Sequence, residues 1–158
     1  MTIDPRRQTL GDALRRTARR YPDKLALTTA DVVWTYAQFD AECNRVAHGL
    51  TDLGVLKGDR VAVFSRNSYA WATLRFALAR LGAVLVPINF MLNAHEVAYI
   101  LRHSGARILA AASDLADTAR QAAAGTDVTH FVWLPVEGGA ASSPPPGENW
   151  VALSLIHI

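Results

Sequence analysis

The residues of this chain that could perform chemistry are few and widely separated. A loop that wraps nucleotide phosphates needs closely spaced glycines, because only glycine lets the backbone approach a phosphate so closely. The sequence contains neither the Gly-x-Gly-x-x-Gly pattern of dinucleotide sites nor the Gly-x-x-x-x-Gly-Lys-Ser/Thr pattern of P-loops. The lysines are Lys24 and Lys57, and Lys57-Gly58-Asp59 is typical of a turn before a strand. We therefore predict no phosphate-binding loop.

The histidines do not form a metal-binding pattern. Five are present, and they occur singly, at His48, His95, His103, His130 and His157. None lies at ligand spacing from another histidine or from the single cysteine. His95 and His103 share an expected helix but are eight residues apart, too far to hold one metal ion. We interpret each histidine as structural or solvated and predict no metal-ligating residue.

Candidate nucleophiles and acid–base pairs are equally weak. Ser65 and Ser68 do not stand in the Gly-x-Ser-x-Gly turn that exposes a catalytic serine. Cys43 falls on the apolar stripe of an expected helix, which indicates a buried thiol. Asp114 and Asp117 are interpreted as first-turn residues that the helix dipole favours. The sequence thus predicts no catalytic, cofactor-binding or metal-ligating residue in this chain.

Composition sets the class of protein. The 158 residues are 51% hydrophobic and carry 16 Lys and Arg against 14 Asp and Glu, a net charge of +2. This indicates one globular domain and excludes disorder over the whole length. The longest apolar runs, Ala83–Ile88 and Ile108–Ala112, are too short to span a membrane, although peripheral association is allowed. Met1–Arg7 is not a secretory signal, and with a single cysteine this predicts a cytoplasmic protein.

One basic cluster needs interpretation. Arg15, Arg16, Arg19 and Arg20 fall at helical spacing on one expected helix. We interpret them as a solvated helix face, with a phosphate or partner contact as the alternative. Because acids and bases alternate elsewhere and the excess is two charges, no nucleic-acid partner is predicted.

Hydrophobic periodicity and capping signals predict the elements that must position any site. The N-terminal part is expected to hold a helix over Thr9–Arg20, two strands over Leu25–Thr29 and Val32–Tyr36, and a helix over Tyr36–Leu53 capped by Thr35 and Gln38. Strands are then expected over Arg60–Ser65, Ala83–Ile88, Arg107–Ala112 and Thr129–Leu134. The helices between them are Ser68–Leu81, one from the Asn93/Glu96 cap to Arg102, and one from an Asp114 cap to Ala124.

From Arg60 onward, strands and helices alternate with short connections. The strands are almost continuously apolar, as parallel strands covered on both faces are. The pattern predicts an α/β fold, a doubly wound, mostly parallel sheet with helices on both faces. Gly138–Gly147 is rich in glycine, serine and proline and is expected to be a loop.

A series of short motifs resembles one family. The motifs are Trp34–Phe39, Asn44–Leu50, Leu53–Val55, Lys57–Val63, Asn67–Ser68, Leu81–Asn89, Glu96–Leu101 and Ser104–Arg107. Their order resembles the N-terminal part of AMP-forming acyl-CoA synthetases, within the adenylate-forming superfamily, over about residues 9–134. The resemblance implies that a carboxylate reacts with ATP and Mg²⁺ to give an acyl-adenylate, from which CoA displaces AMP. Small-molecule carboxylic acids, ATP and CoA are thus the implied partners of the full-length parent.

The resemblance also implies which parts are absent. The family's Ser/Thr/Gly-rich ATP loop ending in Pro-Lys-Gly, its Mg²⁺-serving acid, its ribose-binding Asp and its mobile-domain lysine have no match in Met1–Ile158. We therefore expect an incomplete N-terminal subdomain that is inactive alone. Residues 1–134 would be the N-terminal part of the synthetase domain, residues 135–150 a Gly/Ser/Pro-rich loop, and residues 151–158 a truncated or non-native tail.

The loop after the Ala83–Ile88 strand bears on the subfamily. Carrier-domain adenylation modules commonly have the sequence Val-Pro-Leu-Asp-Pro at this place. This chain has Asn89 where they have Asp, and by its resemblance Asn89 favours a free-standing ligase for fatty or medium-chain acids. Phe90 and Met91 replace the Pro and Arg of many ligases, and their apolar character favours core positions. Three alternatives stay open: a carrier-system adenylation domain, a stand-alone non-catalytic α/β interaction or regulatory module, and a dinucleotide-binding domain.

Overall fold

The computed structural model describes residues 9–138 and 150–153. Its helices are α1 (Leu10–Arg20), α2 (Tyr36–Asp52), α3 (Tyr69–Leu81), α4 (Ala94–Ser104) and α5 (Ala116–Ala123), with a 3₁₀ turn over Ser113–Leu115. Its strands are β1 (Leu25–Thr28), β2 (Val33–Thr35), β3 (Arg60–Phe64), β4 (Val84–Ile88), β5 (Ile108–Ala112), β6 (His130–Leu134) and β7 (Trp150–Ala152). The expectations for Met1–Arg7, residues 139–149 and Ser154–Ile158 lie outside the described residues.

Within the described residues, a parallel sheet has the strand order β4-β3-β5-β6-β7. Val61 of β3 is in register with both Leu85 of β4 and Ile108 of β5, and Ile108 is in register with His130 of β6. The predicted doubly wound parallel sheet is thereby confirmed. Strand β7 was not predicted, because three residues after a long loop carry too little periodicity to indicate a strand.

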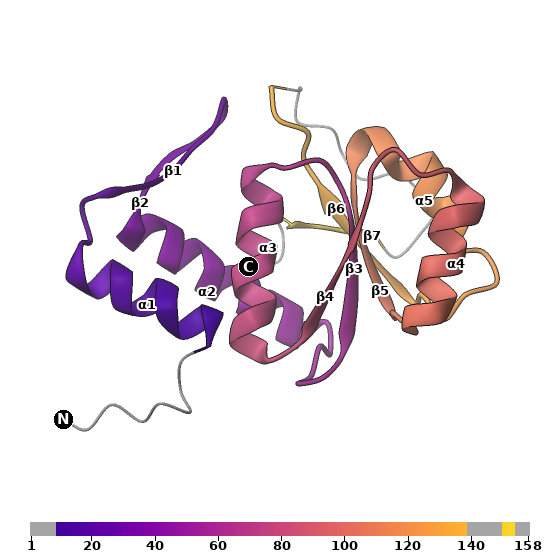
Figure 1. The fold of residues 1–158 in the computed structure, drawn as a ribbon, viewed down its shortest axis with the longest axis horizontal. Helices are drawn as coiled ribbons and strands as arrows, with labels where there is room; N and C mark the ends of the chain where they lie inside the picture. The colour runs from indigo at the N-terminus through magenta and orange to yellow at the C-terminus, as the bar shows by residue number, and fades with distance from the viewer. Residues whose placement is uncertain (1–8, 139–149, 154–158) are drawn as a thin grey trace.

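Helices cover both faces of this sheet, as Figure 1 shows with α3 on one side and α4 and α5 on the other. Side chains alternate between the faces along each strand. Val61 and Val63 join Leu50 and Leu74 in the core beneath α2 and α3. On the opposite face, the core beneath α4 and α5 is rich in alanine, with Ala62, Ala98, Ala106, Ala111, Ala116, Ala119 and Ala122 among its members.

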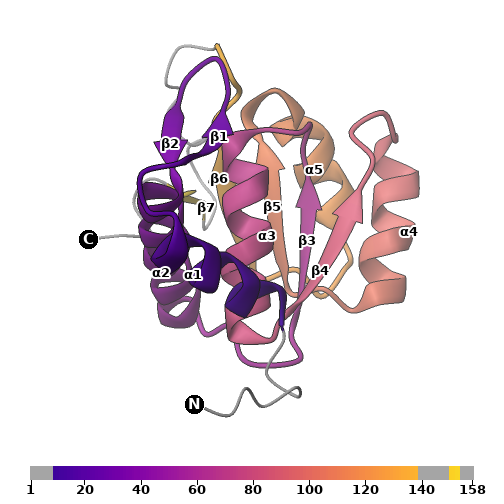
Figure 2. The same cartoon turned by 60° about the vertical axis from the view of Figure 1, so that its left-hand side comes forward.

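A further layer packs outside α2 and α3. It consists of α1 and the antiparallel hairpin β1–β2, which stand together at one end of the molecule (Figure 2). Leu14, Phe39 and Cys43 form its small core. The Phe39 ring packs edge-on against Phe76 of α3, 5.4 Å between ring centroids, so this layer is fixed to the helices beneath it.

Capping residues explain where most helices begin and end. Thr35 with Gln38, and Asn93 with Glu96, form the reciprocal pairs of hydrogen bonds of a capping box. Gly82 and Gly105 adopt left-handed backbone conformations, with φ of 70° and 63°, directly after α3 and α4. These boundaries confirm the prediction to within two residues.

The start of α5 corrects one prediction. Asp114 does not cap the helix: it lies in the preceding 3₁₀ turn, and among the described residues no side chain makes a capping hydrogen bond to α5. Its carboxylate instead pairs with Arg66. No helix in the described part of the chain is long and apolar enough to cross a membrane.

Candidate functional site

The candidate site is the crevice at the carboxyl ends of β3 and β5. The chain leaves β3 toward β4 on one side of the sheet and returns to β5 on the other, so the winding direction reverses between them. Ligands of open α/β sheets bind at such a reversal, where the loops after the two strands diverge. A cavity of about 210 Å³ lies there, lined by Ser65, Arg66, Asn67, Ser68, Ala112, Asp114, Pro135, Val136 and Glu137.

Arg66 is the cation at the mouth of this crevice. It follows β3 directly, and its guanidinium pairs with Asp114 of the loop after β5. The guanidinium carbon also lies 4.6 Å from the centre of the Phe90 ring, in a cation–π contact. Arg66 is half exposed and could reach an anion in the crevice. Sequence reasoning missed it, because its partners are 48 and 24 residues away and no local pattern marks it.

The N-terminus of α3 opens into the same crevice, but two of its backbone donors, the N–H groups of Tyr69 and Trp71, already have partners. The Ser68 hydroxyl accepts a hydrogen bond from the Trp71 N–H at 3.1 Å. The Glu137 carboxylate, which follows β6, accepts one from the Tyr69 N–H at 3.0 Å. Glu137 thus stands where a phosphate binds in dinucleotide folds. Because this turn also lacks glycine, the crevice fits a nucleotide pyrophosphate poorly.

A second contact ties the segment after β6 to the hairpin. The Gly138 N–H donates to both carboxylate oxygens of Asp31, at 3.0 and 3.1 Å. The pKa of the nearby Tyr69 hydroxyl is raised. The main cause is burial, and the negative charges of Asp31 and Glu137 add to it. Between the hairpin and α3, a hollow of about 530 Å³ is lined by Leu27, Thr28, Thr29, Asn67, Ser68, Trp71, Ala72, Arg75 and Glu137.

The loop after β4 forms the opposite wall of the crevice and corrects another prediction. Phe90 is 37% exposed and Met91 is 78% exposed, so the interpretation of both as core residues is wrong. The Asn89 side chain accepts a hydrogen bond from the Met91 N–H at 3.0 Å, which shapes this turn. Asn89 and Phe90 also line a neighbouring hollow of about 330 Å³ that continues to Arg66.

The remaining sequence candidates are dispersed. His48, His95 and His103 are exposed, and His103 stacks on Tyr99 with 5.8 Å between ring centroids. Over residues 9–138 and 150–153, no group of three or more His, Cys, Asp or Glu side chains could hold a metal ion. Cys43 is fully buried, as predicted, and burial raises the pKa of its thiol to about 12.

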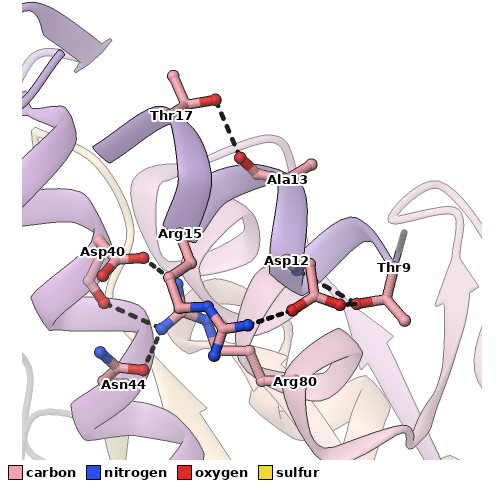
Figure 3. A network of polar contacts seen from close by, with 8 residues as sticks. All are labelled: Thr9, Asp12, Ala13, Arg15, Thr17, Asp40, Asn44 and Arg80. Atoms are coloured by element: carbon pink, nitrogen blue, oxygen red, sulfur yellow. Dashed lines mark hydrogen bonds and ion pairs between the residues drawn. The ribbon is translucent and has the colours of Figure 1, made fainter. Parts of the chain in front are cut away.

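Two sets of polar contacts lie outside the crevice (Figure 3). One, between Thr9, Asp12 and Arg15, stays within the start of α1, and the other joins α2 to α3. Arg80, in the last turn of α3, pairs with the Asp40 carboxylate and donates hydrogen bonds to Asn44 and to the Asp40 carbonyl. Gly11 of α1 lies against it, since a Cβ at Gly11 would stand 2.9 Å from the Arg80 Cγ. The side chains of Arg80 and Asp40 are largely buried, 12% and 18% exposed, and their contacts hold α2 and α3 together.

Comparisons with known proteins agree with this architecture. The family model described as "AMP-binding enzyme" matches residues 14–149. Long-chain-fatty-acid–CoA ligase FadD13 of Mycobacterium tuberculosis is 44% identical over 104 residues, 65% of this chain and 21% of that protein. Human mitochondrial medium-chain acyl-CoA ligase ACSF2 is 38% identical over 104 residues, 65% of this chain and 17% of ACSF2.

Solved structures give the same result. The anthranilate CoA ligase AuaEII in complex with anthranoyl-AMP superposes with a TM-score of 0.83 at 29% identity, covering 94% of this chain and 27% of that one. The inhibitor-bound N-terminal domain of FACL13 from Mycobacterium tuberculosis superposes with a TM-score of 0.74 at 36% identity, covering 87% of this chain and 37% of that one. The chain spans about a fifth of the length of the curated relatives that it matches.

Proposed function

The chain belongs to the family of AMP-binding enzymes, and we propose that it forms the N-terminal portion of an ATP-dependent acyl-CoA ligase. In the proposed reaction, a carboxylate oxygen attacks the α-phosphorus of ATP and releases pyrophosphate, giving an acyl-adenylate. The CoA thiolate then attacks the acyl carbon and releases AMP. The proposed substrates are fatty or medium-chain acids.

The observation that carries this proposal is the family match over residues 14–149. It is supported by the names of the similar proteins, which include a medium-chain and a long-chain acyl-CoA ligase. The similar structure with an acyl-AMP bound belongs to a CoA ligase as well. These likenesses favour a CoA ligase over a carrier-system adenylation domain.

The chemistry of the described residues favours a supporting role for this stretch. Adenylate formation needs cations or backbone donors aimed at phosphate oxygens. In the crevice, Glu137 already takes an α3 backbone donor and Asp114 already pairs with Arg66. The residues present therefore fit neither the ATP phosphates nor Mg²⁺. We propose that this portion supplies scaffold and crevice wall, and that the 158 residues are inactive alone.

Two measurements test the proposal together. Sequencing the gene beyond the Trp150 codon should reveal a Ser/Thr/Gly-rich loop closed by Pro-Lys-Gly. Fatty-acid-dependent exchange of pyrophosphate into ATP should be found with the complete gene product and not with residues 1–158. Exchange by the 158 residues would contradict the scaffold role, and a complete product without exchange would contradict the ligase assignment.

A second candidate is a stand-alone α/β interaction or regulatory module. One observation favours it: helices cover both faces of the sheet, over separate apolar cores. The ligase portion should instead associate in solution, because β4 lies at the sheet edge and Val84 is 48% exposed there. Size-exclusion chromatography and thermal unfolding decide between them, since a monodisperse monomer with one sharp transition would favour the module.

A further inference from the structure

A second cavity lies at the amino ends of the strands, at the end of the sheet opposite the crevice. Its volume is about 260 Å³, and its polar lining consists of Asp59, Arg60, Arg107, Thr129 and His130. The parallel strands run from this end to the crevice, as the arrow of β3 shows in Figure 2. Among the described residues, none lines both hollows. This amino-edge cavity is therefore separate from the candidate site.

Three basic side chains reach the amino-edge cavity from three neighbouring strands. Arg60 begins β3, Arg107 directly precedes β5 and His130 begins β6. The register places Val61 beside Ile108, and Ile108 beside His130. Arg60 and Arg107 each precede one member of the first pair. Their Cα atoms therefore lie about one strand spacing apart, about 5 Å, and their side chains leave the same face of the sheet.

The charges of the two arginines are not neutralised by acids of the chain. Like charges that stand side by side on neighbouring strands repel each other. Within the described residues, neither Arg60 nor Arg107 has an ion-pair partner. Asp59 is the acid in the wall, and its carboxylate accepts a hydrogen bond from the Leu56 N–H at 2.8 Å. Two cations against one acid give the lining an excess of positive charge.

Helix ends do not account for these arginines. Helices α2 and α4 end at this side of the sheet, and a helix C-terminus carries a partial negative charge that favours cations. The free carbonyls there are bound by backbone: the Val55 N–H donates to the Leu50 carbonyl, and the Gly105 N–H donates to the Leu101 carbonyl. In the part of the chain that the structure describes, neither arginine side chain donates to a helix carbonyl. Both are exposed and available to a ligand.

The backbone holds this lining in place. The Arg107 carbonyl accepts hydrogen bonds from the Thr129 N–H at 2.9 Å and the His130 N–H at 3.3 Å, which ties the starts of β5 and β6 together. The Thr129 hydroxyl lies 3.0 Å from Nδ1 of His130. This contact orients the imidazole and leaves Nε2 as the ring nitrogen that a ligand can use.

We propose that the amino-edge cavity binds the phosphate group of a small molecule. Arg60 and Arg107 donate to its oxygens from neighbouring strands, because the guanidinium fork matches phosphate geometry, and His130 donates from Nε2. A carboxylate is satisfied by one such fork, whereas two forks and an imidazole match the larger number of phosphate oxygens. The cavity is smaller than the about 300–1,000 Å³ of most ligand pockets, so the group attached to the phosphate is small.

Equilibrium dialysis of the 158-residue chain with ³²P-labelled inorganic phosphate tests the proposal. Binding should be saturable at one phosphate per chain and should persist when acetate is added at matched ionic strength. Displacement of the label by glycerol 3-phosphate supports a phosphate ester as the ligand, and displacement by unlabelled phosphate alone supports the free ion. Equal displacement by acetate would overturn the phosphate assignment, and absence of saturable binding would overturn the site.

Matched variants locate the binding. R60Q/R107Q should lower the affinity for phosphate at least about ten-fold, because it removes charged donors. The control R16Q/R19Q makes the same charge change at two exposed positions on α1 and should stay within about two-fold of the parent. His130→Leu keeps both arginines and should weaken binding about five-fold. Equal losses in the two double variants would show unspecific attraction and overturn the proposal.

Thermal unfolding separates ligand binding from a structural role of the arginines. Phosphate should raise the melting temperature of the parent and of R16Q/R19Q, and leave that of R60Q/R107Q unchanged. Without phosphate, R60Q/R107Q should melt no lower than the parent, because the substitution removes a repulsion. A variant that melts lower but binds phosphate as the parent does would assign the arginines to the fold and overturn the proposal.

Discussion

The two faces of the parallel sheet are covered by helices that are held in different ways. Beneath α4 and α5, the core is built largely from alanine, and one layer of helices completes that side. Beneath α2 and α3, leucine and valine fill the core, and α1 with the hairpin adds a second layer. The two helices beneath that second layer, α2 and α3, are joined by polar contacts of Arg80, and Gly11 of α1 packs against the same side chain.

The difference shows where this fold depends on single residues. A helix packed through many alanines loses little when one contact changes, because each contact contributes a small dispersion energy. The junction of α2 and α3 instead depends on a largely buried guanidinium with a few partners, and α1 packs against it. A buried charge that loses a partner costs several kcal/mol. We therefore expect the largest single-residue effects at the junction of α1, α2 and α3.

Replacing Arg80 should produce the largest effect. Arg80→Met keeps the length of the side chain but leaves the largely buried Asp40 carboxylate without its cation, so the free energy of unfolding should fall by about 3 kcal/mol. Denaturant titration of both proteins measures the change. Arg75→Met, one turn earlier on α3 and exposed, is the control and should change stability by less than about 0.5 kcal/mol. Equal effects of the two substitutions would contradict a special role for this junction.

Gly11→Ala should have the next largest effect, with a sign opposite to the usual one. Alanine normally stabilises a helix relative to glycine. Here its Cβ would stand 2.9 Å from the Arg80 Cγ and 3.2 Å from the Arg80 backbone, so α1 must shift. We expect a loss of about 2 kcal/mol in the free energy of unfolding. Arg16→Ala on the exposed side of α1 is the control, and a stabilised Gly11→Ala protein would show that this close approach is absent.

On the opposite face, two substitutions distinguish a cap from a surface ion pair. Asn93→Ala removes both side-chain bonds that begin α4, and should lower the free energy of unfolding by about 1 kcal/mol. Asp114→Ala removes only the pairing with Arg66, which is half exposed, and should cost less than about 0.5 kcal/mol. Thermal unfolding compares the two. A larger loss of unfolding free energy for Asp114→Ala than for Asn93→Ala would indicate that Asp114 does cap α5.

The smallest effect concerns Cys43 in the core of the second layer. Burial raises the pKa of its thiol from 9.0 to about 12, so the folded protein keeps the thiol protonated while the unfolded chain ionises it above about pH 9. The contribution of this thiol to the free energy of unfolding is therefore fully present below pH 9 and is lost as the pH rises. The loss amounts to about 0.5 kcal/mol near pH 9. Cys43→Ala should flatten the pH dependence by that amount. A thiol reagent should label Cys43 only after unfolding, and rapid labelling of the folded chain would show that the layer opens.

Local signals in the sequence were sufficient to predict most element boundaries. The polar pairs Thr35/Gln38 and Asn93/Glu96, and the glycine after α4, act through bonds to backbone only a few residues away. Asp114 was misassigned because it fits the pattern of a cap, while its actual partner, Arg66, comes from another strand.

The crevice could not be predicted for a related reason. Glu137 reaches the Tyr69 N–H across 68 residues of sequence, and Asp31 reaches Gly138 across 107. Such contacts exist only because the parallel sheet brings distant loops to one edge. Phe90 was predicted to be a core residue because it is apolar. Its actual position beside Arg66 arises because the sheet brings the loops after β3 and β4 together at the same edge.

The residues that revealed the family hold the fold together. Asn44 accepts a hydrogen bond from Arg80, and Trp34 packs edge-on against Tyr69 with 5.6 Å between ring centroids. Gly82 ends α3 in a left-handed conformation and accommodates the Lys57 side chain. This explains how a stretch with no predicted catalytic residue can still be recognised.

The acyl-CoA ligase assignment is tested most directly by mass spectrometry of the products formed by the complete gene product. Incubated with a medium-chain or long-chain fatty acid, ATP, Mg²⁺ and CoA, it should form acyl-CoA and AMP in equal amounts, and acyl-adenylate when CoA is omitted. Formation of ADP in place of AMP, or acyl-adenylate that is never converted to acyl-CoA, would contradict the assignment.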